Sequence, residues 1–415
     1  MDWLLSALAL FNLVSTVLVF SPRMVPRRSI PFGVFAFALP ATELAWIWLP
    51  LQISVTALLV WGGALQNLLG LIALTVLLVT WPGLAWNIWR AADTKDVVEK
   101  ALREGLGTGY RDNVPPTARE KFREKVSFSN WRNPVGFDVD GVEIIRNIPY
   151  APGGIRQQLN IYRPQNTRPE EPLPVLLQIH GGGFLWGNKD QQAQPLLHTL
   201  ASRGWIGVSI NYRLSPSVGF PTHLEDCKRA LCWIRKHGAE YGMDTNFVAV
   251  TGGSAGGILT ALMGLTCNKP ELQKDHPEVD TSLQAVVPFY GLYDLLARYG
   301  QHQNQAMWED FLGGKVFHES LEDNPELWEL ASPISDIHPD APPFMVIHGS
   351  FDSLCLVTEG RVFSEKLVEV SNNPVVYLEL PGAEHGYDTI RSVRTEHTID
   401  GIHRFLEWVR AYQGK

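Results

Sequence analysis

Short runs rich in β-branched residues alternate with helical stretches over the last two thirds of this chain. Eight such runs stand at residues 142–148, 157–162, 174–180, 206–212, 247–250, 284–289, 343–349 and 375–380. Strands that alternate with helices predict a mostly parallel, doubly wound α/β sheet. In such a sheet, ligands bind at the carboxyl ends of the strands. We therefore expect the functional residues directly after these runs.

A glycine-rich segment, VTGGSAGG at residues 250–257, ends the fifth run. Its glycine spacing does not match the G-x-G-x-x-G of dinucleotide-binding folds, and it lacks the Gly-Lys-Ser/Thr ending of a P-loop. It does contain G-x-S-x-G centred on Ser254, with a predicted strand before it and a helical stretch after it. This order is typical of a nucleophile elbow, in which a strained turn exposes the serine and its neighbours must be small. Ser254 is the candidate nucleophile.

A serine hydroxyl needs a general base, because it is a poor nucleophile at neutral pH. Among the 12 histidines, His385 lies in the loop LPGAEHGYD, just past the last predicted strand and beside small residues. His180 and His348 also end predicted strands, but each continues into a glycine turn, which suggests another role. His385 is therefore the candidate base.

A carboxylate must orient the imidazole of that base. Asp352 follows the seventh predicted strand and Asp294 follows the sixth, so both are candidates, and we favour Asp352. The chain order is then Ser, Asp, His, which is the order of α/β-hydrolases. The segment IHGGGF at residues 179–184 follows the third run, and its glycines leave backbone N–H groups free to stabilise an oxyanion.

The first ninety or so residues carry almost no charge. Residues 3–20 are long enough to span a hydrocarbon core, which takes about 17–25 residues, and they lack the basic start and cleavage site of a signal peptide. Apolar sequence continues over 31–61 and 65–89. We predict an all-α transmembrane region of about three helices within residues 1–90, with the second span at 44–61; buried helices of a soluble protein are the alternative. The segment PFGVFAFALP fits either an extended second span or an interfacial or re-entrant piece.

Positive charge predicts the orientation of these spans. Arg23, Arg27 and Arg28 lie in the first loop, the loop at 62–67 has no Lys or Arg, and Arg90 ends the third span. The positive-inside rule then places the first loop and the C-terminal part of the chain on the cytoplasmic face. We therefore expect a multi-pass integral membrane protein with a cytoplasmic catalytic domain and the lipid bilayer as a partner.

Charge and cysteine content limit the other partners. The formal net charge of −8 and the lack of a long basic run argue against nucleic acid. The four cysteines form no CxxC pair and no cluster with histidines, so neither a zinc site nor a disulfide framework is indicated. We expect no cofactor and no metal, and nothing in the sequence specifies an oligomeric state.

The segments HGGGF, NYRLSP, GGSAGG, HGSFDSL and GAEHGY together resemble the hormone-sensitive-lipase branch of the α/β-hydrolases, in particular its bacterial membrane-associated esterases. The resemblance covers roughly residues 143–411. It implies that Ser254 is the nucleophile, His385 the base and Asp352 the acid. It also implies that the oxyanion donors are Gly182, Gly183 and Ala255, and that His180 has a structural role.

The resemblance also implies an α/β-hydrolase fold with a helical cap. The catalytic domain would cover 143–415, and cap helices over the acyl pocket would come from 91–142 and from an insert near 295–335. Two departures stand out. Gly253 stands where many relatives have Asp or Thr, and Ser215 and Ser217 replace the usual Ala and Glu. The acyl pocket and the surroundings of the elbow are therefore expected to differ from those of the relatives.

The predicted function is a carboxylic ester hydrolase that acts on lipophilic acyl esters through an acyl-enzyme intermediate. An amidase or aminoacyl-peptidase would use the same triad, but the sequence shows no propeller domain and no charged specificity pocket. A non-catalytic receptor of the same fold is a second alternative, although such proteins have lost the histidine that is present here. A membrane scaffold or transporter is a third, although the predicted spans hold one carboxylate and no paired charges.

Overall fold

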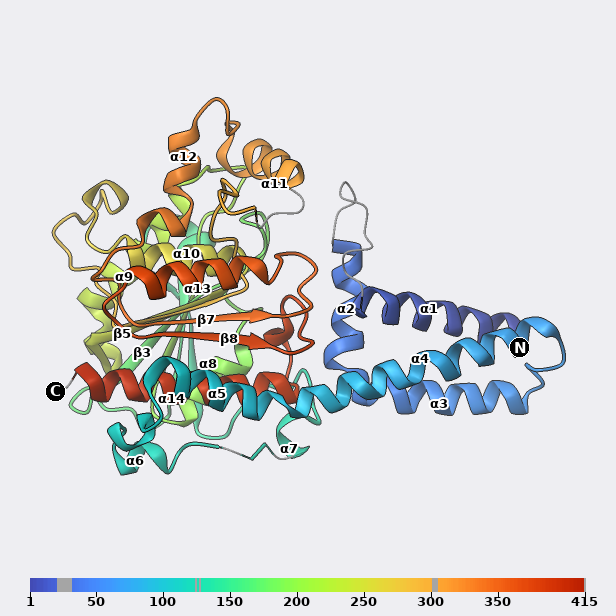
Figure 1. Cartoon of the computed structure of the whole chain (residues 1–415). Helices are drawn as coiled ribbons and strands as arrows, with labels where there is room; N and C mark the ends of the chain where they lie inside the picture. Colours follow the sequence, from blue (N-terminus) through green and yellow to red (C-terminus); the bar gives the residue numbers. More distant parts are fainter. Residues whose placement is uncertain (21–31, 124, 127, 301–304, 414–415) are drawn as a thin grey trace.

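The computed structural model describes residues 1–20, 32–123, 125–126, 128–300 and 305–413. A group of helices stands to one side of a larger α/β body (Figure 1). We call this group the N-terminal helices; it comprises α1 (Asp2–Phe20), α2 (Phe32–Glu43), α3 (Ala45–Trp61) and α4 (Leu68–Ala92). The sheet of the α/β body starts at residue 142.

The α/β body contains one eight-stranded sheet. Its strands are β1 (Val142–Pro149), β2 (Gln158–Pro164), β3 (Leu173–Ile179), β4 (Ile206–Ile210), β5 (Met243–Gly253), β6 (Ala285–Phe289), β7 (Phe344–Gly349) and β8 (Val375–Leu380). They lie in the order β1-β2-β4-β3-β5-β6-β7-β8. β2 pairs antiparallel with β1 and β4, and all other pairs are parallel. The eight predicted strands and the mostly parallel sheet are confirmed.

Helices cover both faces of the sheet, which explains why its central strands are almost continuously apolar. Leu177 and Leu176 are adjacent on β3 and pack into two separate cores. The first core includes α9 (Thr222–His237), α10 (Ala255–Leu265) and α13 (Thr358–Val370), and the second includes α5 (Thr94–Leu106), α8 (Gln194–Ser202) and α14 (Val393–Gln413). The two sets lie above and below the sheet in Figure 1. With both faces covered, the carboxyl ends of the strands are left for a site.

After the N-terminal helices, α5 packs beneath the sheet, against β8 and α14. The predicted apolar stripe of α5 is buried, with Val98 and Leu102 inaccessible to solvent in the same core as Val376 of β8 and Ile402 of α14. The short elements η2 (Tyr110–Asn113), α6 (Pro116–Arg119) and α7 (Phe128–Trp131) follow. The stripe is thus an ordinary packing surface.

The N-terminal helices enclose polar side chains. Asn12 of α1 donates a hydrogen bond to Thr80 of α4 (2.5 Å) and accepts one from Gln52 of α3 (3.1 Å), and Trp81 donates to Gln52 (3.0 Å). α1 and α4 run in the same direction, because Asp2 contacts Asn67 at one end and Phe20 contacts Trp86 at the other. α3 runs back between these ends (Figure 1).

The outer surface of these helices is apolar. Most of the exposed large apolar side chains in the described residues lie here, among them Leu10, Leu58, Trp61, Leu68 and Val79. Within the described residues, α4 is the one helix long and apolar enough to cross a membrane, and α2 with α3 would qualify only as a broken segment bent by 97°. α1 counts only as a shorter apolar helix, over Asp2–Val17.

The prediction of a multi-pass region of about three spans is therefore not supported as made. α3 begins at Ala45, close to the predicted start of the second span. The segment PFGVFAFALP belongs mostly to α2, which is a separate helix set at a steep angle to α3 and does not extend it. The arginines of the first loop lie outside the described residues, so the orientation stays a prediction.

Candidate active site

Ser254 lies in the turn between β5 and α10. Its φ of 60° and ψ of −124° form a strained conformation for a residue with a side chain. An added Cβ at Gly252 would lie 2.5 Å from the carbonyl oxygen of Ile179, and one at Gly256 would lie 2.2 Å from the same atom. The end of β3 thus leaves no room for side chains on either side of the serine, which is the physical reason for the G-x-S-x-G spacing.

The unusual Gly253 also has a steric explanation. An added Cβ at this position would lie 2.7 Å from the phenol oxygen of Tyr290, which follows β6. Tyr290 donates a hydrogen bond to Asp388, and its ring centroid lies 4.5 Å from that of His385. Glycine at 253 therefore makes room for a tyrosine that packs beside the candidate base.

His385 and Asp352 are hydrogen-bonded to each other. Asp352 Oδ2 lies 2.8 Å from Nδ1 of His385, and Oδ1 accepts hydrogen bonds from the backbone N–H groups of Leu354 (2.9 Å) and Cys355 (2.7 Å). Burial raises the pKa of Asp352. The charge of His385 and the hydrogen bonds from His348 and His385 lower this pKa by more than burial raises it, so the net shift is downward. Asp352 is thus a buried carboxylate that orients the imidazole.

The competing carboxylate has another partner. Asp294 accepts hydrogen bonds from the backbone N–H of Arg298 (2.7 Å) and from its Nε (2.9 Å). The structure therefore brings Asp352, and not Asp294, to His385. Ser254 and His385 border the same cavity. Within the described residues no hydrogen bond joins Ser254 Oγ to His385 Nε2, and such contacts are often long in unliganded enzymes.

The predicted oxyanion donors border that cavity too. Gly182 and Gly183 have φ values of 108° and 60°, and a Cβ at Gly182 would lie 2.3 Å from the carbonyl oxygen of Trp186. In the described part of the chain, the backbone N–H groups of Gly182, Gly183 and Ala255 have no hydrogen-bond acceptor. The neighbouring Gly181 N–H donates to Gln192 Oε1 (2.6 Å). Three unused donors therefore lie beside the serine.

The two other strand-end histidines lie behind the site. His180 is fully buried and stacks on Tyr212 with ring centroids 4.4 Å apart. Burial lowers the pKa of His180 to about 4, so its imidazole is neutral. His348 Nε2 lies 2.7 Å from the carbonyl oxygen of Cys355 and 3.4 Å from Asp352. Both histidines support loops of the site from within the core.

The cavity beside Ser254 encloses about 840 Å³, including its open mouth, and most of its walls are apolar. α11 (Gln305–Leu312), in the predicted cap insert, contributes Trp308 and Phe311. Among the described residues, none from 91–142 borders the cavity, because α5 packs beneath the sheet. This corrects the expectation that residues 91–142 cap the pocket. Among the described residues before 143, Phe35 of α2 borders the cavity instead.

Two residues of the site were missed from the sequence. Glu384 Oε1 accepts hydrogen bonds from the N–H groups of Ser353 (2.7 Å) and His385 (2.8 Å), which ties the acid and base loops together. Burial, and then the charge of Asp352, raise the pKa of Glu384. An acidic residue directly before the candidate base was a usable signal for Glu384. Phe35 offered none, since it is one apolar residue among many.

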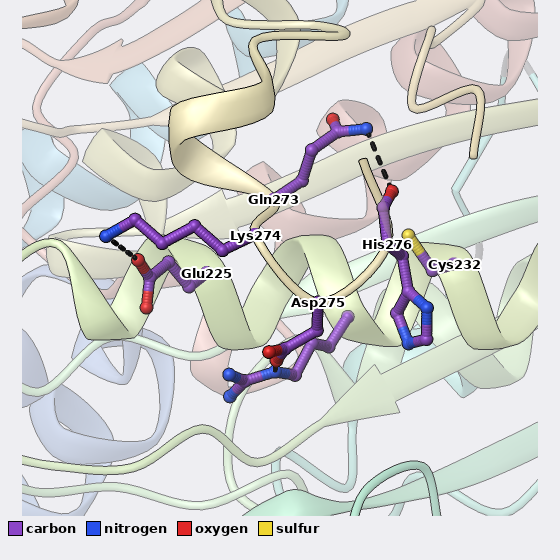
Figure 2. A pocket seen from close by; sticks show the side chains of 7 residues that line it. Glu225, Cys232, Gln273, Lys274, Asp275 and His276 are labelled. Atoms are coloured by element: carbon purple, nitrogen blue, oxygen red, sulfur yellow. Dashed lines mark hydrogen bonds and ion pairs between the residues drawn. The ribbon is translucent and has the colours of Figure 1, made fainter. Parts of the chain in front are cut away.

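A second depression lies elsewhere on the α/β body, between α9 and the loop after η5 (Pro270–Leu272). Its charged side chains pair with each other: Asp275 pairs with Arg229, and Lys274 pairs with Glu225 (3.2 Å), as Figure 2 shows for the latter pair. Burial raises the pKa of the adjacent Cys232 thiol to about 11, which makes it a poor nucleophile. The charged side chains of this depression are therefore used in ion pairs at the surface, and Ser254, His385 and Asp352 do not border it.

The strand order, the strained serine after β5 and the acid and base loops after β7 and β8 define an α/β-hydrolase. A protein-family profile described as BD-FAE matches residues 159–367. Esterase LipQ of Mycobacterium tuberculosis is 37% identical over 320 residues, which are 77% of this chain and 75% of the relative. The probable carboxylic ester hydrolase LipM of the same organism is 39% identical over 341 residues, 79% of this chain and 76% of the relative.

Solved structures agree on the fold. Esterase B from Lactobacillus rhamnosis matches with a TM-score of 0.55 at 20% identity, over 78% of this chain and 98% of that one. The chain belongs to the hormone-sensitive-lipase-like family of α/β-hydrolase esterases and is a carboxylesterase-type hydrolase. The receptor and scaffold alternatives are thereby left without support.

Proposed function

We propose that this enzyme is a membrane-associated serine esterase whose triad is Ser254, His385 and Asp352. Ser254 Oγ attacks the ester carbonyl carbon while His385 Nε2 takes the hydroxyl proton, and Asp352 stabilises the imidazolium that forms. The proton then passes to the leaving alcohol. A water molecule, activated by the same imidazole, hydrolyses the acyl-enzyme and releases the acid.

The negative charge that develops on the carbonyl oxygen needs donors already in position. We assign this role to the N–H groups of Gly182, Gly183 and Ala255. The observation that carries the proposal is the hydrogen-bonded pair of Asp352 and His385 on the same cavity as a strained serine and three unused N–H groups. The apolar walls of the cavity favour lipophilic acyl esters over charged substrates.

A serine substitution tests the triad. Ser254→Ala is expected to lower hydrolysis of p-nitrophenyl esters by about 10⁶-fold and to abolish labelling by a serine-directed phosphonate. Ser202→Ala is the matched control, because Ser202 Oγ bonds only within α8 (2.8 Å to Thr199 O). Near-normal turnover in the Ser254 variant would refute the assignment.

The membrane part of the proposal concerns the N-terminal helices. Their apolar exterior and hydrogen-bonded interior suit a lipid environment, where polar contacts and close packing hold helices together. By the length of an α-helix, α1, α3 and α4 extend about 28, 26 and 38 Å, against about 30 Å for a hydrocarbon core. Among the described helices α4 alone is long and apolar enough to cross a membrane by itself. We propose that α1 and α3, which are hydrogen-bonded to α4 and to each other through Asn12 and Gln52, cross the bilayer beside it, and that the substrate is a lipophilic ester that partitions there.

With three crossings, the first loop and the α/β body lie on one side, which the arginine pattern places in the cytoplasm. Fusions after Lys415 test this orientation. A fluorescent-protein fusion should be bright and an alkaline phosphatase fusion inactive. The reverse pattern would place the α/β body outside the cytoplasm.

A further inference from the structure

One wall of the catalytic cavity comes from the N-terminal helices. Phe35 of α2 borders the cavity and meets the ring of His385 edge to face, with centroids 6.1 Å apart and planes at 84°. It also lies against Gly386: an added Cβ there would be 3.5 Å from Phe35 Cε2. A helix far from the triad in the sequence thus contacts the candidate base.

A buried guanidinium joins α2 and α4 to the loop of that base. Arg394, at the start of α14, is 1% exposed. It donates hydrogen bonds to Glu43 at the end of α2 (3.1 Å), to the side chain of Asn87 in α4 (2.8 Å) and to the carbonyl oxygen of Pro381 (3.0 Å). Pro381 begins the loop that carries His385. Three separate segments therefore meet at one side chain.

The remaining hydrogen-bonding groups of this cluster are also used. Ser392 donates to the second oxygen of Glu43 (2.7 Å), and Asn87 donates to the carbonyl oxygens of Ala41 (3.2 Å) and Thr42 (2.9 Å). A buried ion pair adds little net stability compared with apolar packing, but losing one partner leaves a costly unpaired charge. The cluster therefore fixes where α2 sits relative to the His385 loop.

The acid loop contacts the same helices. Phe351, next to Asp352, meets the ring of Phe20 at the end of α1, with centroids 6.0 Å apart. It also packs against a small cluster that includes Ala38 of α2 and Leu84 of α4. The residues beside the acid and the base are thus both held by the N-terminal helices.

From these contacts we infer that the N-terminal helices are part of the active site: Phe35 determines which alcohol groups the enzyme accepts, and Arg394 is a positioning residue that holds Phe35 and the His385 loop in register. This inference rests on the proposed esterase function. Because His385 must protonate the leaving oxygen, the alcohol part of a bound ester lies beside His385, and therefore beside Phe35. The carbonyl oxygen points instead to Gly182 and Gly183.

Two ester series read out the role of Phe35 in the full-length protein. One series keeps a butyryl group and lengthens the alcohol, and the other keeps the alcohol and lengthens the acyl chain. Phe35→Ala should raise kcat/KM for the bulkiest alcohol relative to the smallest by about 10-fold, and leave the ranking of acyl chains unchanged. Phe311→Ala is the matched control: Phe311 also borders the cavity but lies near Gly183, where the carbonyl oxygen is proposed to bind, so its loss should leave the alcohol ranking unchanged.

Arg394 is tested through the same readout. Glu43→Gln keeps the shape of the cluster but removes one charge, and Arg394→Met removes the other. Both should shift the alcohol ranking in the direction of Phe35→Ala and lower kcat more than they raise KM, while Arg394→Lys should restore part of the ranking. A merely structural role would lower the yield of folded protein and leave the ranking of the remaining active enzyme unchanged.

The outcomes separate this inference from the function on which it rests. If Ser254→Ala keeps its activity, the triad is wrong. If Ser254→Ala is inactive and Phe35→Ala has the wild-type alcohol ranking, the triad stands and the inference about Phe35 fails. If Phe35→Ala shifts the ranking but Glu43→Gln does not, the role given to the cluster fails.

Discussion

The N-terminal helices expose large apolar side chains of the kind that the α/β body mostly buries. In the α/β body, Val208 and Val250 are inaccessible to solvent. In the N-terminal helices, Asn12 and Gln52 are buried and Val79 is 71% exposed. A fold in water gains stability by removing apolar surface from the solvent, and that gain disappears when the surroundings are as apolar as the side chains. The difference supports the proposal that the N-terminal helices lie in a bilayer while the α/β body lies in water.

The buried polar groups of the two regions also have different uses. Asp352 in the α/β body holds an imidazole at a cavity, whereas Asn12 holds three helices together. At the junction, Glu43 and Arg394 combine the two uses, since they join helices and also brace the loop of His385. Four substitutions test this comparison, and we take them from the largest expected effect to the smallest.

Asp352→Asn should lower turnover by about 10⁴-fold without unfolding the protein, because the amide would stabilise the wrong tautomer of His385. Asp294→Asn is the matched change at another buried aspartate, which pairs with Arg298. It should affect thermal stability much more than turnover. Equal losses of turnover in the two variants would mean that the pairing seen at His385 has no catalytic role.

Val79→Asp places a charge at the middle of α4. In a bilayer this costs about 2.5–3.5 kcal/mol on insertion scales, so the variant should be depleted from the membrane fraction and unfold at a lower temperature. Val368→Asp is the control, because Val368 is 64% exposed on α13 of the α/β body, where a surface charge should change stability by less than about 0.5 kcal/mol. Equal behaviour of the two variants would mean that α4 faces water.

Asn12→Leu removes the side chain that joins α1 to α3 and α4. Hydrogen bonds between helices in membranes average about 0.6 kcal/mol, so we expect a small drop in Tm in detergent or nanodiscs and unchanged hydrolysis of a water-soluble ester. Leu13→Ala, an outward-facing neighbour that is 38% exposed, serves as the control. A rise in Tm for Asn12→Leu would indicate a helix core that is stabilised as in water.

The substitution Lys228→Met in α9 should have the smallest effect, which is a change in Tm that depends on pH. Burial lowers the pKa of Lys228 from the usual 10.5 to about 8, so between these values the unfolded chain binds more protons than the folded one. Stability should therefore rise with pH in this window. Lys228→Met should raise Tm by a few degrees at pH 7.5, and this advantage should shrink towards pH 10.5. A pH-independent difference in Tm would exclude this explanation.

Much of the candidate site could be proposed from the sequence because its signals are local. Ser254, the glycines at 181–183 and His385 each lie in the turn or loop after a strand, and the strands follow from short apolar runs. The choice between Asp352 and Asp294 could not be made locally, because both follow strands at the same edge of the sheet. The structure decided it: Asp294 pairs with Arg298, whereas Asp352 pairs with His385. The position of 91–142 was predicted wrongly, since an amphipathic stripe shows that a helix packs but not on which face of the sheet.

The N-terminal region shows the same limit more strongly. Its composition predicts apolar helices, but only the structure shows that α2 turns away from α3 at Leu44 and brings Phe35 to His385. For that reason, deleting the N-terminal helices would not separate membrane delivery of a substrate from catalysis itself.

The sequence by itself determined the eight strands, the mostly parallel sheet, the candidate nucleophile and base, and the apolar character of the first ninety residues. These follow from periodicity, turn sterics and composition, which act over a few neighbouring residues. Only the tertiary structure decided that Glu43 meets Arg394 and that Phe35 borders the cavity. Such contacts join segments hundreds of residues apart. They are set by how whole elements pack, because a buried charge must find its partner wherever the fold places it.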